Sequence, residues 1–282
     1  MKRRTFVKLT GAAGAALAAG GLSPQAAQAQ EGVGDIANPS AMRVVAWNVA
    51  CGQWCTPEQV ADALKARFDG EAPDIVTLNE VPKFNQGDDA PDWSGEVARL
   101  LALSHVYVGS VSSANHRAPD WGDVTGHYGG KFKSILSRWP ISNTHDYTLA
   151  GEGWSPASAV RAEVRVGEVR WAVYSLHIPG HRDYDKSKHK ALAEDVLAHE
   201  PLEHVLVTGD FNVRTDSAVL ASLKDSAGLT NAITDRAIDH ILYKSAAEVG
   251  VSAAGIDNGP AIDTRTGGLS DHPYAWAALS LG

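Results

Sequence analysis

Cysteine is nearly absent from this chain of 282 residues, which has only two. Both lie in one short segment, as Cys51 and Cys55 of Cys-Gly-Gln-Trp-Cys. Outside the cytoplasm a local disulfide that closes this loop is expected, with two free thiols as the alternative. No second Cys or His pair lies nearby at ligand spacing, so the cysteine pattern argues against a structural zinc site.

Positive charge is also scarce once the N-terminus is set aside. The chain has 25 Lys and Arg against 33 Asp and Glu, and four of the basic residues lie within the first eight positions. Without those four the net charge is −12, with His neutral. This charge disfavours general binding to nucleic acid or to anionic lipid. A polyanionic substrate is still allowed, because bound cations can supply positive charge locally.

A long apolar run is missing as well. Residues 11–22 are rich in Ala and Gly and too short to span a bilayer, so no stable membrane insertion is expected. This stretch follows Arg3 and Arg4 and precedes Ala27-Gln28-Ala29, which has the small-x-small form of a cleavage site. We predict a twin-arginine signal peptide over residues 1–29, which directs a folded protein to the periplasm or the exterior. Retention by an uncleaved signal is the alternative.

The rest of the chain shows no linker or repeat. We expect a loose lead-in over residues 30–40 and one domain over residues 41–282. Short β-branched runs alternate with segments of helical periodicity, which indicates an α/β fold. Strands are predicted at residues 42–46, 74–78, 106–108, 134–137, 159–166, 169–176, 205–208, 238–243 and 274–279. Helices are predicted at residues 57–68, 93–103, 186–199 and 216–227.

Polar residues recur at the ends of these predicted strands. After the apolar run of residues 205–208, Gly209 breaks the pattern, and Asp210 and Asn212 leave on the same side of extended backbone. Each such residue alone fits an ordinary turn. Their recurrence favours one pocket built from distant segments. The other members are Asn48, Glu80, His177, Asp271 and His272 near strand ends, and Asp239 within a strand.

Together these segments resemble the endonuclease/exonuclease/phosphatase superfamily, from Trp47-Asn48 to Ser270-Asp271-His272. The superfamily includes pancreatic-type deoxyribonucleases, abasic-site endonucleases, inositol polyphosphate phosphatases and bacterial sphingomyelinases. The resemblance implies a four-layer α-β-β-α sandwich, with two mixed sheets face to face and helices outside. It also implies hydrolysis of a phosphate ester by direct water attack, without a covalent enzyme intermediate.

The resemblance assigns a role to each matching residue. Glu80 matches the metal-binding glutamate, and Asn48 matches an asparagine that supports the metal or a phosphate oxygen. His177 matches a histidine that contacts the phosphoryl group. Asp210 matches the aspartate that orients or deprotonates the attacking water, and Asn212 matches an asparagine that holds a phosphate oxygen. The implied cation is Mg²⁺ or Mn²⁺, with Ca²⁺ as an alternative.

The closing motifs complete this set. Asp239 matches a carboxylate that positions catalytic groups or a metal. In Ser-Asp-His-Pro, His272 is expected to face the scissile phosphate, while Asp271 fixes its tautomer or helps to bind metal. Arg138 matches an arginine often found at its strand end, and it is expected to contact phosphate. Lys131, Lys133 and Arg138 are expected to form a small basic patch that either holds a second phosphate or solvates a strand edge.

Several features bear on the substrate. Pro82 stands where pancreatic-type deoxyribonucleases place a DNA-contacting arginine, and residues 86–92 are acidic, so DNA is disfavoured. The exposed aromatic hairpin of bacterial sphingomyelinases has no clear counterpart, with Trp121 and Trp154 as loop candidates. The irregular stretch of residues 109–130 is predicted to form the substrate-selecting wall.

Three functions follow from these observations. The first is a secreted, metal-dependent phosphoesterase that acts on small or lipid-derived phosphoesters. The second is an exported nuclease, and the third is a non-catalytic binding module on the same fold. A monomer is expected.

Overall fold

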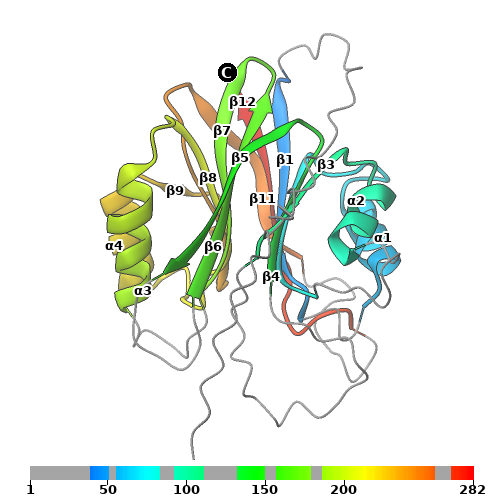
Figure 1. Ribbon diagram of the computed structural model, residues 1–282, viewed down its shortest axis with the longest axis horizontal. Coiled ribbons are helices and arrows are strands. Elements are labelled where there is room, and N and C mark those ends of the chain that lie inside the picture. Colours follow the sequence, from blue (N-terminus) through cyan, green and yellow to red (C-terminus); the bar gives the residue numbers. More distant parts are fainter. Residues whose placement is uncertain are drawn as a thin grey trace, which may run out of the picture. The chain divides into compact units, whose positions relative to one another are not determined.

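The β-branched runs of the sequence form two mixed sheets that pack face to face, with helices on the outer faces (Figure 1). The computed structural model describes residues 39–50, 55–82, 92–110, 132–149, 157–178, 186–257 and 268–282. The predicted signal peptide and most of the lead-in lie outside these ranges. The described residues belong to one compact unit.

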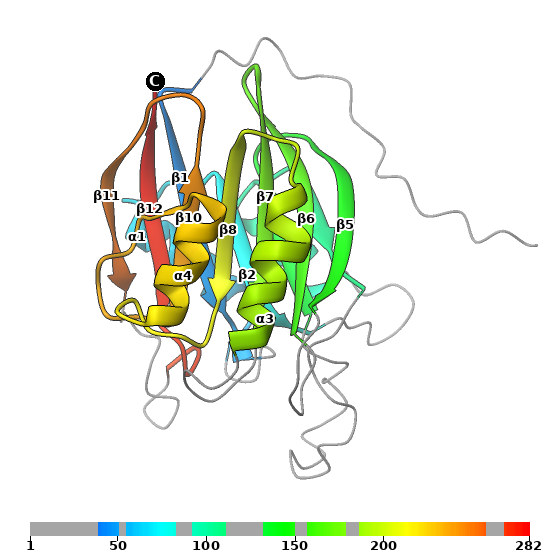
Figure 2. The ribbon, with the colours of Figure 1, turned by 90° about the vertical axis from the view of Figure 1, so that its left-hand side faces the viewer.

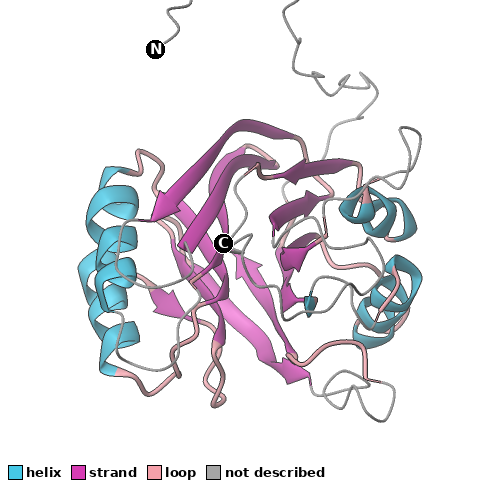
Figure 3. Ribbon diagram, turned by 60° about the horizontal axis from the view of Figure 1, so that its bottom comes forward, coloured by secondary structure: helices cyan, strands magenta, loops and turns pink. Residues whose placement is uncertain are grey.

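The first sheet, sheet A, has β1 (Ala41–Asn48) and β2 (Ile75–Val81) as its parallel pair, and its other strand pairs are antiparallel. The helices α1 (Pro57–Arg67) and α2 (Trp93–Leu100) cover its outer face (Figure 3). Its strand order is β11 (Val249–Asp257), β12 (Tyr274–Leu281), β1 (Ala41–Asn48), β2 (Ile75–Val81), β4 (Phe132–Ser137) and β3 (His105–Val108).

The second sheet, sheet B, has β7 (Val169–His177) and β8 (His204–Asp210) as its parallel pair. The helices α3 (Lys186–Ala191) and α4 (Ala218–Ala227) lie over its outer face, as Figure 2 shows. Its strand order is β5 (Ile141–Leu149), β6 (Ala157–Val166), β7 (Val169–His177), β8 (His204–Asp210), β10 (Asp239–Lys244) and β9 (Thr230–Asn231).

Three apolar layers hold the four structural layers together. The central layer packs sheet A on sheet B through residues such as Ile75 and Leu206. One outer layer packs Leu64 of α1 on sheet A, and the other packs Leu220 of α4 on sheet B. Central strands are therefore covered on both faces, which explains their continuous apolar runs. The predicted α-β-β-α sandwich is confirmed.

Helix ends follow local capping chemistry. The Thr56 hydroxyl accepts from the backbone N–H of Gln59, and the Gln59 side chain accepts from the N–H of Thr56, so α1 begins at Pro57 as predicted. The Ser217 hydroxyl caps α4, which therefore begins two residues after the predicted start. The predicted helix at 186–199 is α-helical only through α3. It continues as a π-helix over Leu192–Val196 and a 3₁₀ turn over Leu197–His199.

Three strands were not predicted. β5 and β11 are edge strands, and their sequences contain few large apolar side chains. β9 has only two residues. An edge strand needs less apolar surface than a central strand, so its sequence carries a weaker signal.

Some predicted features lie wholly or partly outside the described residues. They are Cys51, Lys131, Trp121 and Trp154, together with nearly all of the stretch 109–130. Cys55 is buried and forms no disulfide with a described residue, and burial raises the pKa of its thiol to about 12. Among the helices that the structure describes, none is long and apolar enough to cross a membrane.

Candidate active site

The strand registers place a row of polar side chains at one edge of sheet A. Asn48 at the end of β1 is opposite Asn79 of β2, and Asn79 is opposite Lys133 near the start of β4. Directly opposite residues in a ladder present their side chains on the same face of the sheet. All three side chains are buried. We call Asn48, Asn79 and Lys133 the sheet A row.

A matching row lies at the facing edge of sheet B. Asp239 at the start of β10 is opposite Asp210 at the end of β8, and Asp210 is opposite His177 at the end of β7. His177 is in turn opposite Ser158 of β6. All four side chains are buried. We call Asp239, Asp210, His177 and Ser158 the sheet B row.

Hydrogen bonds join the two rows across the sandwich. The Asn48 amide Nδ2 donates to Asp210 Oδ2 at 3.1 Å, and Asn79 Oδ1 accepts from the Asp210 backbone N–H at 3.2 Å. The Lys133 ammonium donates to the Ser158 hydroxyl. The two rows therefore face each other and form one site at the rim of the sandwich.

Asp210 has both of its carboxylate oxygens held by neighbouring groups. Its Oδ1 accepts from the backbone N–H of Asn212 at 2.8 Å, and its Oδ2 accepts from Asn212 Nδ2 at 3.1 Å. Asn212 makes both contacts because its φ of 52° turns the chain back on itself, a conformation that Asn tolerates well. Burial raises the pKa of the Asp210 carboxyl, while the charge of His272 opposes this effect.

Gly209 explains why the strand can end in this way. Its φ is +131°, and an added Cβ would lie 2.1 Å from the Leu176 carbonyl oxygen on β7. Any side chain at this position would therefore push β8 away from β7. That displacement would break the alignment of Asp210 with His177.

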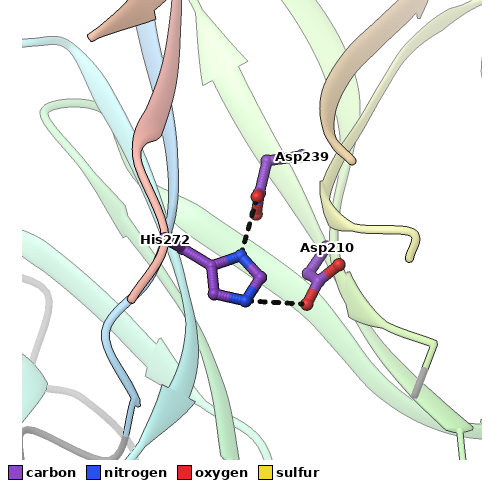
Figure 4. Close-up of side chains that lie close together, drawn as sticks. All are labelled: Asp210, Asp239 and His272. Carbon is purple, nitrogen blue, oxygen red and sulfur yellow. Dashed lines mark hydrogen bonds and ion pairs between the residues drawn. The ribbon is translucent and has the colours of Figure 1, made fainter. Parts of the chain in front are cut away.

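His272 lies between the two aspartates of the sheet B row (Figure 4). Its Nδ1 lies 2.9 Å from Asp239 Oδ2, and its Nε2 lies 3.8 Å from Asp210 Oδ2. Burial alone would lower the pKa of His272, but the charges of Asp239 and Asp210 outweigh burial and raise it to about 10. At neutral pH the ring is therefore a cation held between two acids.

The backbone around His272 is tied to the end of β1. The Ser270 hydroxyl donates to the Asn48 carbonyl at 2.6 Å and accepts from the His272 N–H at 3.1 Å. The indole Nε1 of Trp47 donates to the His272 carbonyl at 3.1 Å. The closing segment is thus fixed on sheet A while its ring reaches sheet B.

Asp271 does not have the place that the resemblance implied. It is exposed, and Asp239 rather than Asp271 contacts the Nδ1 atom of His272. The expected tautomer-fixing contact of Asp271 is therefore corrected to Asp239. The contact to Nδ1 is made by the first residue of β10, which faces the ring from the opposite sheet. The charge of Asp271 still acts on the site, because it raises the pKa of Asp239.

Glu80 reaches the site through a break in strand alternation. Successive residues of a strand normally point to opposite faces, yet Asn79 and Glu80 both contact groups of sheet B. Glu80 has a φ of 51°, and the β2–β4 register shifts between Asn79 and Val81. A bulge of this kind re-aims a side chain. Glu80 Oε1 thereby lies 3.5 Å from His177 Nε2, which is also 3.5 Å from Asp210 Oδ2.

The donor set at the rim fits a hard divalent cation. Glu80, Asp210 and Asp239 bring buried carboxylates together at one rim, and the carboxylates of Asp210 and Asp239 both lie close to His272. The buried Oδ1 of Asp239 has no hydrogen-bond partner among the described residues. Burial raises the pKa of Asp239, and the charge of Glu80 raises it further. Oxygen ligands with excess negative charge are those that Mg²⁺ and Mn²⁺ prefer.

Arg138 is not brought to the site. Because β4 runs antiparallel to β2, the residue after β4 lies at the start of β2, at the other end from Glu80. There the Arg138 guanidinium pairs with Asp74 at 3.2 Å. Lys133 is buried between the sheets rather than on the surface. The expected basic patch of Lys133 and Arg138 is therefore wrong, because strand direction separates the two residues.

Several site residues were not recognised in the sequence as such. Asn79, Ser158 and Ser270 belong to the site because of strand register or a loop contact with another segment. Asn79 directly precedes Glu80 after an apolar run, which is the one local signal that could have indicated it. Ser270 likewise directly precedes Asp271 and His272, whereas Ser158 carries no such signal.

Solved structures share this architecture. An endonuclease/exonuclease/phosphatase from Beutenbergia cavernae aligns over 86% of this chain and 72% of its own, with a TM-score of 0.65 and 19% identity. The human Nocturnin catalytic domain, solved with a bound sulfate anion, aligns over 86% of this chain and 94% of its own, with a TM-score of 0.62 and 17% identity. D. rerio TDP2, solved with a single strand DNA product, aligns over 86% and 100%, with a TM-score of 0.59 and 14% identity.

These likenesses establish the fold, and the sequence establishes the family. A comparison with curated protein sequences finds no significant match. The family model described as the Endonuclease/Exonuclease/phosphatase family matches residues 45–272, which is most of the chain. The chain therefore belongs to the Endonuclease/Exonuclease/phosphatase family, whose members are metal-dependent hydrolases that act on phosphoester bonds.

Proposed function

We propose that this protein is a secreted, divalent-metal-dependent phosphoesterase that hydrolyses small or lipid-derived phosphoesters by direct in-line attack of water. The observation that carries the proposal is the convergence of Glu80, Asp210, His177 and His272 on one rim, each held by a partner from another strand or segment. Phosphoryl transfer needs positioning and charge stabilisation more than covalent chemistry.

Glu80 is the proposed principal metal ligand, with the oxygens of Asn48 and Asp271 as further donors. The cation is Mg²⁺, with Mn²⁺ and Ca²⁺ as alternatives. When bound, a cation of this kind neutralises charge on the phosphoryl oxygens. The Asn48 amide has a second task, because its Nδ2 holds Asp210 Oδ2.

Asp210 is the proposed residue that orients and deprotonates the attacking water. Its two oxygens are already fixed by Asn48 and Asn212, so the carboxylate does not need to reorganise during attack. The raised pKa of the buried carboxyl makes it a better proton acceptor than an exposed aspartate. Asn212 and His177 flank it and hold phosphoryl oxygens in this account.

His272 is the proposed positive group on the opposite side of the scissile phosphate. Its ring stays protonated at neutral pH because Asp239 binds Nδ1. The Nε2–H can therefore donate to an oxygen on which negative charge develops. Asp239 acts through His272, as a positioning residue.

The proposed substrate class and location rest on the sequence and the described surface. The net charge of −12 without the signal segment and the presence of Pro82 disfavour a long nucleic acid. Val251 is the one large hydrophobic side chain that is exposed within the described ranges.

Export is proposed to depend on Arg3 and Arg4. A double replacement of these residues by lysine should leave the protein in the cytoplasm. Unchanged export of this variant would refute the twin-arginine route.

A nuclease is the second candidate, because the chain shares its fold with D. rerio TDP2, which was solved with a single strand DNA product. The test is to incubate residues 30–282 and Mg²⁺ with plasmid DNA, RNA, bis-p-nitrophenyl phosphate and sphingomyelin. The first proposal expects turnover of the small or lipid phosphoester without DNA nicking. Nicking of plasmid at low protein concentration would replace it with the nuclease. No turnover, with a His272→Ala variant equally inert, would favour a non-catalytic binding module.

A further inference from the structure

Lys133 is a fully buried lysine that the proposed mechanism leaves without a role. It is the last member of the sheet A row, opposite Asn79. An ammonium group is costly to bury unless it is paired or hydrogen-bonded. Its Nζ crosses the space between the sheets and donates to the Ser158 hydroxyl. The charge is therefore held in a defined place.

That place is beside the phosphoryl-binding part of the site. Ser158 is directly opposite His177 in the β6–β7 ladder, so their Cβ atoms lie about 5 Å apart on the same face. On sheet A, Asn79 lies opposite Lys133 and accepts from the backbone N–H of Asp210. Lys133 thus contacts the residue that is opposite His177 in sheet B, and it is itself opposite the residue that precedes Glu80 in sheet A.

Positively charged side chains lie at both ends of the sheet B row. His272 supplies positive charge at the Asp239 end of the row. Lys133 supplies positive charge at the Ser158 end, with Asp210 and His177 between the two. An anionic group that binds at the centre of the row would lie between two fixed cations. By Coulomb's law, a unit positive charge roughly 7 Å from a bound anion, at an effective dielectric constant of about 20, strengthens the binding of that anion by roughly 10- to 100-fold.

We propose that Lys133 is a positioning residue for the anionic phosphoryl group of the substrate. Its ammonium, anchored by Ser158 beside the His177 position of the ladder, draws the phosphoryl oxygens toward that end of the row. The inference rests on the proposed phosphoesterase function. It adds a determinant of anion binding that is separate from the metal ligands.

The test compares Lys133→Met, which keeps the apolar volume and removes the charge, with Lys244→Met. Lys244 lies at the far end of β10 from Asp239 and is a matched control for loss of one charge. Three quantities are measured for each protein: kcat/KM on bis-p-nitrophenyl phosphate, affinity for inorganic phosphate with Mg²⁺ present, and affinity for Mg²⁺ alone. Lys133→Met should lower the first two by roughly 10- to 100-fold and leave Mg²⁺ affinity equal or higher, because a nearby positive charge is removed. Lys244→Met should match the wild type.

A merely structural role would give a different result. In that case Lys133→Met would lower the melting temperature and weaken Mg²⁺ and phosphate binding together, and that outcome overturns the inference. So does wild-type affinity for phosphate in a folded Lys133→Met protein. If this variant does not fold, Ser158→Ala keeps the charge but removes its anchor, and it should weaken phosphate binding several-fold; unchanged binding would overturn the inference. A wild-type protein that hydrolyses nothing but binds phosphate through Lys133 would refute the proposed function alone.

Discussion

Asp239 and Asp210 are directly opposite each other in the β8–β10 ladder and bracket one histidine ring. Asp239 Oδ2 lies 2.9 Å from His272 Nδ1, and Asp210 Oδ2 lies 3.8 Å from His272 Nε2. Because β8 and β10 are antiparallel, the end of β8 lies beside the start of β10 at the same rim of sheet B. Two acids that lie 29 positions apart in sequence thereby act on one imidazole.

Replacement of Asp239 by asparagine should separate catalysis from folding. The change removes the charge that keeps His272 protonated, so kcat/KM should fall by roughly 100- to 1,000-fold. Circular dichroism without metal should match the wild type, because asparagine has the shape of aspartate and only the charge is removed. The exposed Asp225→Asn on α4 is the control and should retain wild-type activity. Near-normal turnover by Asp239→Asn would remove this residue from the site.

Metal binding should stabilise the fold through Glu80. A ligand at 100 times its Kd stabilises a folded protein by about 2.7 kcal/mol, so saturating Mg²⁺ should raise the melting temperature of the wild type. Glu80→Gln should lose most of this shift, whereas the exposed Glu248→Gln should keep it. The measurement is thermal unfolding with and without Mg²⁺. An equal shift in wild type and Glu80→Gln would contradict the assignment of Glu80 as principal ligand.

His240 should make stability depend on pH below neutrality. Its ring is buried, with Nε2 2.8 Å from the Val213 carbonyl and Nδ1 facing Asn231 Nδ2 at 3.3 Å, so the neutral ring is satisfied. Burial lowers the pKa of His240 from 6.5 to about 4. The unfolded chain then binds the proton more readily, and stability is lost as the pH falls from 6.5 toward 4, by about 3 kcal/mol.

The matched variant for this effect is His240→Gln, which can still donate to the Val213 carbonyl. Denaturant unfolding from pH 8 to pH 4 gives the free energy of unfolding of both proteins. The aspartates of the site titrate in both proteins. Subtracting the curve of the variant from that of the wild type therefore removes their contribution and leaves that of His240. The stability of the variant relative to the wild type should rise as the pH falls below 6.5. Parallel curves would refute the assignment.

A buried ion network on sheet B should be costly to break on one side. Arg161 donates two hydrogen bonds to Glu200, at 2.8 and 2.9 Å, and a third to Glu163 at 3.2 Å. Arg161→Met leaves buried carboxylates without their partner and should lower the free energy of unfolding by about 3–5 kcal/mol. The double variant Arg161→Met, Glu200→Met should be more stable than that single variant. A single variant as stable as the wild type would contradict this account.

All strands inside the two sheets could be predicted from the sequence, and so could β3, a short edge strand. β2 and β8 are buried along nearly their whole length, and the apolar runs within them were recognised to within three residues of the strand ends. β5 and β11 are edge strands that bury less, so no comparable pattern marks them. The hydrophobic pattern of a strand reflects how much of the strand is buried, so the pattern is weakest in the strands that are buried least.

The candidate site was predictable only in part, for a related reason. Asp210, His177 and Glu80 end buried strands, and the end of an apolar run is visible in a sequence. Lys133 and Ser158 belong to the site through register, which depends on pairing with other strands. Arg138 was placed at the wrong rim because a single sequence does not reveal whether β4 runs with or against β2.

Hydrolysis of bis-p-nitrophenyl phosphate by the wild type and by Asp210→Asn decides whether this rim is a phosphoesterase site. The wild type should turn over the substrate in a reaction that needs Mg²⁺ and is abolished by EDTA. Asp210→Asn should lose at least about 1,000-fold of this activity at an unchanged melting temperature, because the residue that orients the water has lost its charge. Turnover within a few-fold of wild type in a folded Asp210→Asn protein would remove Asp210 from the catalytic role proposed for it.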